Sequence, residues 1–480
     1  MSREVIVGQA RATAVVLAAG DGKRMKSSVP KVLQVAAGRP LLAHVLTALD
    51  PLALDDRIVV CSRRIDEIKA AIAPEGLVAD VSYVVQEPPR GTADAVRVAL
   101  EAASTHSAVL LVVQGATPLL STQTLRALLE AHAERSAGVT VLTAMMQDAT
   151  GYGRMVRIGN RPTKIVEERD ASPQEREVRE VNAGVYVFDV DALGSVLPKV
   201  DAENSQGEYY LPDVVELLRS QGLSVHAERT DPGEIVGVKT RAHLALVSKV
   251  LRRRACERWM LEGVTVIDPD VTYIDSTVTI GRDAIVHPFT FLEGATHIDE
   301  NAEIGPHTRI VDSSIGAGAT VGYSVVLSSD VGPEVSVGPF ASLRPGTRLE
   351  QGAQAGSFVE LKNAVVGPGS KVNHLSYVGD ACLGAGVNVG AGTVTCNWDG
   401  QTKHETVIGD DAYIGSDTML VAPVTVGERA ATGAGAVVTR DVPEDALAVG
   451  APARLLLGRG DRMGRKARKE RTGEPEEPRQ

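Results

Sequence analysis

The C-terminal half of the chain is constrained by small aliphatic residues that recur every six positions. The period begins at Ile280 and, with a few irregular steps, continues to Thr432. Glycine often follows the aliphatic residue, as in Ile304-Gly305 and Ile414-Gly415, and glycine permits a turn. Such a hexapeptide repeat is typical of a parallel β-helix, in which three short strands and their turns close one triangular coil. We therefore predict a β-helix whose axis is filled by Ile280, Val286, Leu292, Ile298, Ile304, Ile310, Ile315, Val321, Val331, Val337, Leu343, Leu349, Ala355, Leu361, Val366, Val372, Val378, Leu383, Val389, Ile408, Ile414, Leu420, Val426 and Thr432.

The composition restricts the class of protein further. A chain of 480 residues is too long for one ordinary hydrophobic core, so we expect at least two domains. Aromatic residues make up 3% of the sequence, against 44% for all hydrophobic residues, which suits the narrow interior of a β-helix. The formal net charge of -11 argues against a nucleic-acid-binding protein, which would carry a basic face. Anionic small molecules remain candidate ligands where cations gather locally.

The N-terminal half has a different pattern, in which short apolar runs alternate with helix-like stretches. This alternation predicts a doubly wound, Rossmann-like α/β domain with a parallel sheet. The sites of such a domain lie at the carboxyl ends of its strands. The expected strands are residues 14–17, 57–61, 81–85, 108–113 and 139–142, and the clearest helices are residues 40–49 and 92–102.

These patterns divide the chain into four parts. Residues 1–240 form the predicted α/β domain, and residues 241–263, rich in Leu, Ala, Arg and Glu, form a linker helix. Residues 264–458 form the β-helix domain. The charged tail, residues 459–480, lacks an apolar period, so we expect it to be disordered.

Cysteine usage and hydropathy indicate the compartment. Cys61, Cys256, Cys382 and Cys396 are far apart in the sequence, which argues against a zinc site or a disulfide framework. The longest apolar stretch of the first half, residues 108–113, is too short to span a membrane, and the start of the chain lacks a signal-peptide pattern. We therefore expect a soluble, cytoplasmic protein.

A glycine-rich loop follows the first predicted strand. Residues 17–25 read LAAGDGKRM, and Pro30-Lys31 follows shortly after. Glycines between a strand and a helix let backbone N–H groups approach phosphate oxygens, and Arg24 and Lys31 would neutralise the phosphate charge. The string resembles that of the sugar-phosphate nucleotidyltransferases. More narrowly, it resembles the bifunctional N-acetylglucosamine-1-phosphate uridyltransferase / glucosamine-1-phosphate acetyltransferase family.

The resemblance to this family continues through the N-terminal half. The segment with Gln86 and Gly91-Thr92 is similar to the family's uracil-reading segment, and Gly151–Arg154 is similar to its sugar-contacting loop. Residues 165–167, 181–184 and 204–210 also match. The resemblance implies that nucleotide and sugar are bound by Leu17, Gly20, Gly22, Arg24, Lys31, Gln86, Gly91, Thr92, Gly153, Glu167 and Asn182.

Two positions that hold the metal in this family are changed here. The family's Gly-Asp-x-Pro-Leu reads Gly-Ala-Thr-Pro-Leu at residues 115–119, and its Gly-Val-Asn-Asn-Arg reads Gly-Val-Lys-Thr-Arg at residues 237–241. Mg²⁺ in nucleotidyl transfer is held by one or two protein groups besides phosphate oxygens. With Ala116 and Lys239 at these positions we predict no metal site, and Mg²⁺ is required only if this half is active. Lys239 would preserve the positive charge needed to bind a sugar nucleotide. Alternatively, Asp94 would act as a carboxylate that compensates for the lost metal ligands.

An insertion interrupts the hexapeptide period between Val394 and Ile408. Residues 395–403, TCNWDGQTK, do not fit the repeat, so we expect them to loop out from a corner of the β-helix. Polar insertions on a solenoid usually lie on its binding face. His374 precedes this insertion. A lone histidine is more often a surface or packed residue than a base, but here Arg344, Lys362 and Asn388 belong to the same cluster.

The strings around these residues resemble the acetyltransferase half of the same family, which implies a left-handed β-helix. The matching segments are residues 343–346, 358–362, 374–380 and 388–392. Two departures are Trp398, where the family has Tyr, and residues 450–454, which offer no clear counterpart to an Arg that follows the family's last coil. The resemblance implies that the sugar phosphate is bound by Arg344, Lys362 and Lys403, the sugar by Tyr377, Asn388 and Asn397, and acetyl-CoA by Ala391, Ser416 and Ala434.

His374 is then the predicted catalytic base. An amine attacks a thioester only as the free base, and an imidazole can remove its proton near neutral pH. Glu360 or Asn397 could orient the ring. Backbone N–H groups near Ala391 are candidates to stabilise the oxyanion.

The leading interpretation is an acetyl-CoA-dependent N-acetylation of glucosamine 1-phosphate, in a bifunctional protein for UDP-N-acetylglucosamine synthesis whose UTP-dependent uridylyl transfer is impaired. One alternative is a fully bifunctional enzyme with an unusual metal site that serves cell-wall precursors. Another is an acetyltransferase of a different amino sugar with a non-catalytic sugar-nucleotide-binding domain. We expect small-molecule substrates, no nucleic-acid or membrane partner, and, from the resemblance, a homotrimer with acetyl sites between subunits.

Overall fold

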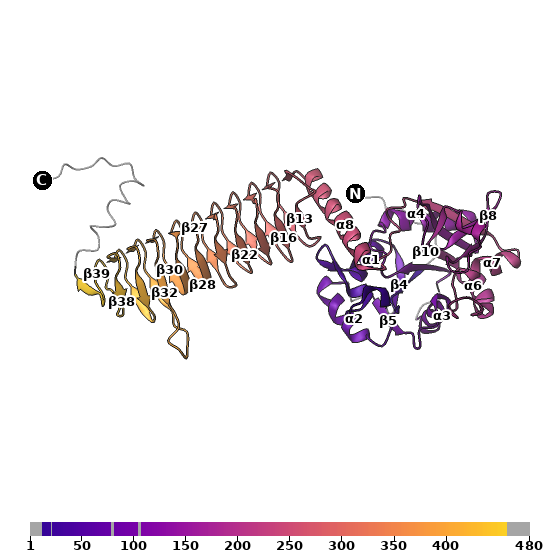
Figure 1. Cartoon of the computed structure of the whole chain (residues 1–480), viewed down its shortest axis with the longest axis horizontal. Coiled ribbons are helices and arrows are strands. Elements are labelled where there is room, and N and C mark those ends of the chain that lie inside the picture. Colours follow the sequence, from indigo (N-terminus) through magenta and orange to yellow (C-terminus); the bar gives the residue numbers. More distant parts are fainter. Residues whose placement is uncertain (1–11, 21, 78–80, 104–106, 458–480) are drawn as a thin grey trace. The chain divides into compact units, whose positions relative to one another are not determined.

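The computed structural model describes residues 12–20, 22–77, 81–103 and 107–457, and the predicted tail at residues 459–480 lies outside them. The chain divides into two compact units between Leu251 and Arg252, within helix α8 (Arg241–Leu261). Figure 1 draws the first unit in indigo to magenta and the second mainly in orange to yellow.

The first unit is built on a mixed sheet with the strand order β11-β7-β10-β6-β1-β4-β5. β10 runs antiparallel to its neighbours β6 and β7, and the other neighbours in this order are parallel. A hairpin of β8 (Arg154–Ile158) and β9 (Arg161–Val166) joins the sheet through β10. The strands of the main order are β1 (Ala12–Leu17), β4 (Leu54–Cys61), β5 (Val81–Val85), β6 (Val109–Gln114), β7 (Val139–Met145), β10 (Glu180–Asp189) and β11 (Val225–Thr230).

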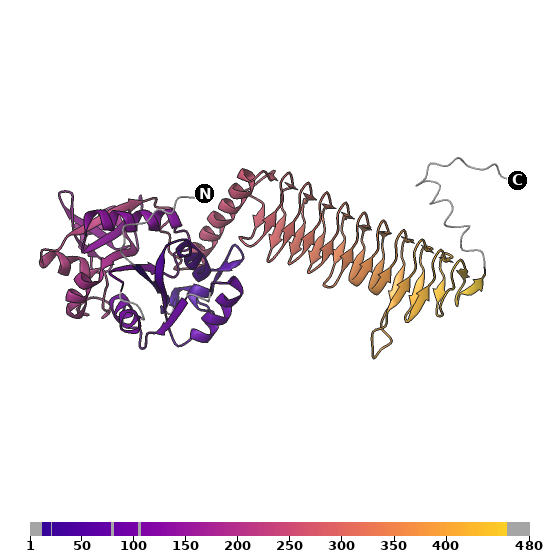
Figure 2. The same cartoon turned by 180° about the vertical axis from the view of Figure 1, so that it is seen from behind.

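Helices cover both faces of this sheet (Figures 1 and 2). Because successive residues of a strand point to opposite faces, Val16 belongs to the apolar core that includes α1, α2 and α4, while Val15 belongs to the core that includes α3, α6 and α7. The helices are α1 (Leu41–Leu49), α2 (Ile65–Ile72), α3 (Thr92–Ala102), α4 (Thr122–Arg135), α5 (Pro173–Arg176), α6 (Val190–Val196) and α7 (Asp213–Ser220).

The doubly wound α/β architecture predicted for this half is confirmed, but the prediction of a parallel sheet was wrong in part, because β10 and the β8–β9 hairpin are antiparallel. Strand β5 and helix α3 have the predicted bounds, whereas β4 begins at Leu54 rather than at residue 57 and β7 continues to Met145. Apolar side chains identify where a strand is buried, and the partly exposed ends carry the weaker signal.

Within the described residues, no helix is both long and apolar enough to cross a membrane.

The second unit is a left-handed parallel β-helix. It runs from β12 (Thr265–Val266) to β39 (Leu447–Val449), and β40 (Arg454–Leu456) turns back antiparallel onto β39. Each strand pairs with the strand one coil later, as Val286 pairs with Ile304. Every axis position predicted from the six-residue period is buried, and nearly all of them belong to one continuous aliphatic core. The prediction of a hexapeptide β-helix is therefore confirmed.

One corner of the β-helix carries a row of neighbouring rings, mostly stacked, which we call the aromatic ladder. Its members, Phe289, His307, Tyr323, Phe340 and Phe358, have left-handed backbone conformations with φ between 50° and 61°. The centroids of successive rings lie 4.8 to 5.9 Å apart, and the side chains are exposed. A left-handed conformation costs a non-glycine residue about 1–2 kcal/mol, and each stacked pair offsets about 0.5–1.5 kcal/mol of this.

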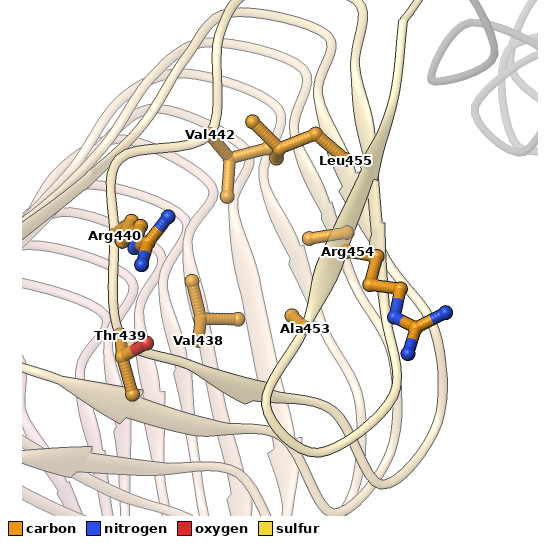
Figure 3. A pocket seen from close by; sticks show the side chains of 8 residues that line it. Val438, Thr439, Arg440, Val442, Ala453, Arg454 and Leu455 are labelled. Atoms are coloured by element: carbon orange, nitrogen blue, oxygen red, sulfur yellow. The ribbon is translucent and has the colours of Figure 1, made fainter.

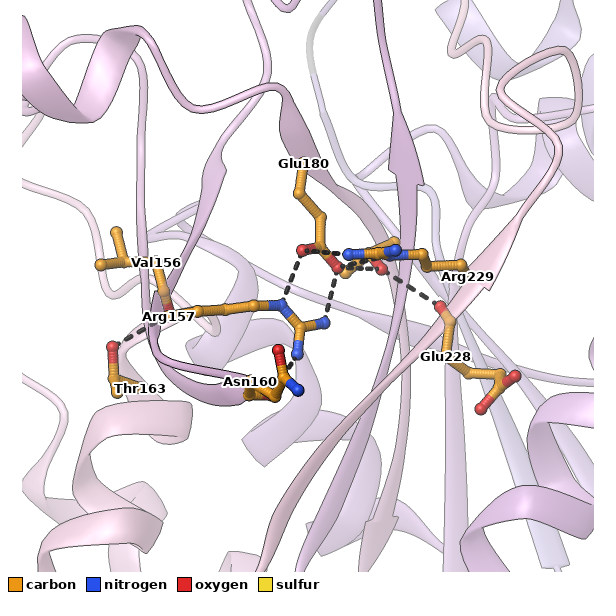
Figure 4. A network of polar contacts seen from close by, with 8 residues as sticks. Val156, Arg157, Asn160, Thr163, Glu180, Glu228 and Arg229 are labelled. Atoms are coloured by element: carbon orange, nitrogen blue, oxygen red, sulfur yellow. Dashed lines mark hydrogen bonds and ion pairs between the residues drawn. The ribbon is translucent and has the colours of Figure 1, made fainter.

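A buried carboxylate fastens the β8–β9 hairpin to the sheet (Figure 4). Glu180 is 5% exposed, and it accepts hydrogen bonds from Arg157 Nε at 2.7 Å and from Thr143 Oγ1 at 2.9 Å. A nitrogen of Arg229 on β11 lies 3.3 Å away. Burial alone would raise the pKa of Glu180, but the hydrogen bonds from Arg157, Arg229 and Thr143 outweigh burial and lower the pKa to about 2.

We expect Glu180→Gln to destabilise the first unit by about 3 kcal/mol, because Arg157 loses its charged partner in a largely buried site. The folded-state pKa of Glu180 lies below the ordinary value of 4.5, so its contribution is full above that pH and is lost as the pH falls toward about 2. Urea unfolding of both proteins at pH 7 and pH 3 measures the effect, with Glu203→Gln on an exposed loop as the control. The difference between the native protein and the Glu180→Gln variant should shrink at pH 3, and a constant difference would contradict the assignment.

Candidate functional sites

Gly22 allows the first loop to close against Lys31. It has a φ of 61°, and a Cβ at this position would lie 2.7 Å from Lys31 Cβ. Gly20 is exposed and has open space around its Cα. Burial first, and then the charges of Arg24 and Lys239, lower the pKa of Lys31. The structure therefore gathers the predicted phosphate-binding residues Arg24 and Lys31 with Lys239, which the sequence predicted to preserve charge at this site.

The two positions expected to hold a metal lie side by side. Leu17 ends β1, and its carbonyl accepts a hydrogen bond from Gly115 N at 3.0 Å. Val238 N in turn donates to Ala116 O at 2.8 Å. This backbone contact brings Lys239 to the carboxyl ends of β1 and β6, where Ala116 is buried.

The predicted uracil-reading segment is also assembled. Gln86 is buried, and its Nε2 donates to Gly91 O at 3.0 Å and to Asp94 Oδ2 at 2.9 Å. A Cβ on Gly91 would lie 2.5 Å from Tyr209 O, so this position requires glycine. Thr92 Oγ1 accepts a hydrogen bond from Leu211 N at 3.0 Å.

The three predicted sugar positions converge at the start of the β8–β9 hairpin. A Cβ on Gly153 would lie 2.9 Å from Glu167 Oε1, and Asn182 N donates to Gly153 O at 2.9 Å. Asn182 Nδ2 also donates to Tyr186 Oη at 2.7 Å. Burial raises the pKa of Glu167, and Lys239 opposes this effect.

The residues at the expected metal positions do not fit a divalent cation. Ala116 has no side-chain oxygen, and Lys239 Nζ donates a hydrogen bond to Gly151 O at 2.6 Å. The same ammonium lies 4.1 Å from the centroid of the Tyr152 ring. Among the described residues, no group of three or more His, Cys, Asp or Glu side chains could hold a metal ion.

Sequence reasoning missed the residues that fasten the Gly151–Arg154 loop. Glu168 Oε2 forms an ion pair with Arg154 Nη1 at 2.7 Å and accepts a hydrogen bond from Gly151 N at 3.3 Å. One sign of this contact was present in the sequence, because Glu168 directly follows Glu167 and the family resemblance implies a role only for Glu167. The loop is therefore held from one side by Glu168 and from the other by Lys239.

In the second unit, three cations gather at one corner of the β-helix. Leu343 of β25 (Ser342–Leu343) pairs with Leu361 of β28 (Glu360–Val366), so the following residues, Arg344 and Lys362, stack on one another. Arg344 Nη1 is 2.8 Å from Glu360 Oε1. The nearby Lys403 ammonium first, and then Arg344, lower the pKa of Lys362. Crowded ammonium groups of this kind favour an anionic ligand.

Two of the predicted sugar-binding residues lie beside these cations. Asn397 Nδ2 donates to Asp380 Oδ2 at 2.5 Å and lies 3.4 Å from Tyr377 Oη. A Cβ on Gly379 would clash with the same Tyr377 oxygen. Asn388, in contrast, lies on the preceding face of the prism, where it pairs with Lys371.

His374 and the three predicted acetyl-CoA residues form one column along the next corner. His374 O accepts from Gly392 N at 3.4 Å, Ala391 O from Asp417 N at 2.7 Å, and Ser416 O from Gly435 N at 2.8 Å. Each residue of the column therefore lies directly on the one from the next coil. The members, which we call the acyl column, are His374, Ala391, Ser416 and Ala434.

One copy of the chain does not bring His374 to the cations. His374 is the last residue of β29 (Lys371–His374), and the chain turns a corner of the prism at Leu375. The next face carries the first residues of β30 (Tyr377–Leu383), and Lys362 pairs with Gly379 at the far end of this face. This face is about 10 Å wide at 3.3 Å per residue. Glu360 is held by Arg344 and Asn397 by Asp380, so in one chain neither is placed to orient the exposed ring of His374.

The predicted insertion projects from the β-helix as a narrow loop between β32 (Val394–Cys396) and β33 (Thr406–Ile408) (Figures 1 and 2). Trp398 and Lys403 form an antiparallel bridge across it, and His404 Nε2 lies 2.7 Å from Asp399 Oδ2. The prediction differs in one detail, because Thr395 is still a buried strand residue.

A cavity of about 340 Å³ opens in the last coil (Figure 3). Val438, Val442 and Leu455 line it, with Arg440 and Arg454 on opposite sides. These arginines are cations beyond the end of the acyl column, in the region where the sequence offered no clear counterpart to the family's arginine.

The two units together define a class of two-domain transferases, with a nucleotide-binding α/β unit and a hexapeptide β-helix. Residues 14–182 match the MobA-like NTP transferase domain, and residues 405–440 match the bacterial transferase hexapeptide (six repeats). The bifunctional protein GlmU of Streptomyces avermitilis is 50% identical over 442 residues, which cover 91% of both chains. That of Carboxydothermus hydrogenoformans is 45% identical over 437 residues, 91% of this chain and 96% of the relative. The chain belongs to the GlmU family of bifunctional proteins.

Proposed function

We propose that the chain N-acetylates glucosamine 1-phosphate with acetyl-CoA, as one step of a bifunctional route to UDP-N-acetylglucosamine. The observation that supports this best is the acyl column, which continues from His374 along the prism one face away from the corner of crowded cations. We assign this step to residues 264–458, the nucleotidyltransferase-like domain to residues 1–240, and the linker helix to residues 241–263. We also propose that the protein acts in the cytoplasm on small molecules, with no nucleic-acid or membrane partner.

In the proposed reaction each group has one task. Arg344, Lys362 and Lys403 bind the phosphate on C1 of the sugar, which positions the amine on the adjacent carbon C2 for reaction. His374 removes a proton from the amine while the new C–N bond forms. The C–S bond then breaks, and the leaving thiolate takes up the proton. Backbone N–H groups near Ala391 stabilise the oxyanion between these steps.

The remaining contacts follow the same division. Tyr377, Asn388 and Asn397 hold the sugar, and Ala391, Ser416 and Ala434 line the groove for acetyl-CoA. Thiol release from acetyl-CoA with a panel of amino sugars tests the assignment. Faster turnover with another acceptor than with glucosamine 1-phosphate would favour an acetyltransferase for that sugar instead.

We propose that the active form is a homotrimer, because His374 and the phosphate-binding cations lie at opposite ends of one face in a single chain. The aromatic ladder supports this, since exposed rings in a continuous row are typical of a surface that a partner covers. The ladder continues at Leu375, which is 64% exposed and adjoins His374. A second copy packed on the ladder would complete the site.

Phe358→Asp is expected to reduce the particle from a trimer to a monomer, because a carboxylate in a packed interface loses its hydration without gaining a partner. Light scattering gives the mass, and acetyl transfer should fall with it. Ile158→Asp is the matched control, because Ile158 is 67% exposed and Phe358 is 60% exposed, and Ile158 lies in the first unit. A Phe358→Asp protein that keeps the native mass would contradict the proposed interface.

We propose that uridylyl transfer in the first unit is impaired. Nucleotidyl transfer depends on a cation that neutralises the reacting phosphates, and Ala116 and Lys239 offer no ligands for Mg²⁺. Asp94 does not replace them in the described structure, because its carboxylate already accepts hydrogen bonds from Gln86 and, at 2.5 Å, from Arg97. Magnesium-dependent release of pyrophosphate from UTP and N-acetylglucosamine 1-phosphate, at the rate of an intact relative, would instead indicate a fully bifunctional enzyme.

A further inference from the structure

Three cationic side chains converge beside the glycine loop of the first unit. Arg24 follows the loop, Lys31 packs against Gly22, and Lys239 arrives from the segment that follows β11. Burial first, and then the charge of Arg24, lower the pKa of Lys239. A cluster of like charges is a favourable binding site for an anion.

Both the backbone and the ammonium group of Lys239 are held in place. Its backbone is fixed because the preceding residue, Val238, donates to Ala116 O at 2.8 Å, and its ammonium donates to Gly151 O at 2.6 Å. The Tyr152 ring, 4.1 Å from the ammonium, adds a cation–π contact. A lysine normally keeps a flexible, hydrated head group, so this degree of positioning is unusual.

The loop that Lys239 contacts is also fastened by other side chains of the protein. Gly151 N donates a hydrogen bond to Glu168 at 3.3 Å, and Arg154 forms an ion pair with Glu168 at 2.7 Å. The loop contains Gly153 and adjoins Glu167 and Asn182. A loop held by the protein's own contacts loses less freedom when a ligand binds.

We propose that Lys239 converts the N-terminal site into a metal-independent binding site for a nucleoside-diphosphate sugar, with the ammonium in the place of a divalent cation. The inference deepens the proposed function, from which the ligand class is taken. An ammonium neutralises phosphate charge but has no coordination positions to polarise a reacting oxygen. The site therefore binds the nucleotide sugar without needing Mg²⁺ and gains nothing from it.

Calorimetric titration of the full-length protein with UDP-N-acetylglucosamine, in EDTA and again in millimolar Mg²⁺, tests this directly. We expect the two dissociation constants to agree within about twofold. Lys239→Asn should weaken binding in EDTA by about tenfold or more, as expected for loss of one charge-assisted contact. Lys239→Arg, which keeps the charge, should retain most of the affinity. Lys199→Asn, an exposed lysine on another part of the unit, is the control.

Binding that requires Mg²⁺ would overturn the inference, and so would a Lys239→Asn protein that binds as tightly as the native one. Absence of binding in both buffers would overturn it as well. None of these outcomes depends on turnover, so the impairment of uridylyl transfer is judged separately, by pyrophosphate release.

Discussion

Replacement of His374 by alanine is expected to reduce acetyl transfer to glucosamine 1-phosphate by about 10²- to 10⁴-fold, the usual contribution of a positioned general base. His374 is exposed at the end of β29, and its backbone carbonyl makes the contacts to the next coil, so the variant should fold and assemble normally. Thiol release from acetyl-CoA gives the rate. Raising the pH should recover part of the loss, because a larger fraction of the amine is then unprotonated.

A matched histidine separates this effect from a general change of the surface. His287 also lies on the β-helix, where its Nε2 is 2.8 Å from Glu303 Oε1, and His287→Ala should leave the rate unchanged. If His374→Ala retained native activity with an unchanged dependence on pH, the acyl column would have no base and the mechanism would be wrong.

The double variant Ala116→Asp, Lys239→Asn is expected to gain magnesium-dependent uridylyl transfer by about 100-fold over the native chain, because a correctly held metal contributes several kcal/mol to the transition state. Each single change should give much less. In the Ala116→Asp variant the new carboxylate would pair with the Lys239 ammonium, and the Lys239→Asn variant would leave the metal with one protein ligand. Pyrophosphate release with and without EDTA measures the gain.

The relative from Streptomyces avermitilis provides the reference rate for this experiment, and circular dichroism of each variant checks that the first unit is folded. A native chain that already turns over at the reference rate would show that Lys239 does not impair the reaction. A double variant that binds UTP and Mg²⁺ but stays inactive would show that further residues of the site have diverged.

The sequence predicted the architecture of both halves well, because the responsible signals are local. In the β-helix, the six-residue period alone predicts that a side chain such as Ile304 is buried. The few places where the spacing differs from six residues do not disturb the coil. In the α/β unit, runs such as Val109–Gln114 are largely buried strands and look apolar almost throughout. The ends of β4 and β7 were less clear because polar residues interrupt them.

The arrangement of the sites was harder to predict, because it depends on contacts between distant segments. Lys239 and Gly151 are 88 positions apart, and their hydrogen bond exists only once β11 and the β8–β9 hairpin have packed. Glu180 likewise joins three strands. The grouping of His374 with Arg344 and Lys362 came from family strings, whereas the register shows that a face of the prism separates them in one chain.

Each coil of the β-helix hydrogen-bonds only to the coil before it and the coil after it, with the same parallel edge on both sides. Repeat architectures of this kind tolerate the gain or loss of a whole unit, since the new junction is equivalent to the old one. Evolution could therefore lengthen or shorten the prism ahead of His374 in steps of one coil. The reactive groups of the last coils would keep their mutual spacing through every such change, so the reach of the molecule and its chemistry can vary independently.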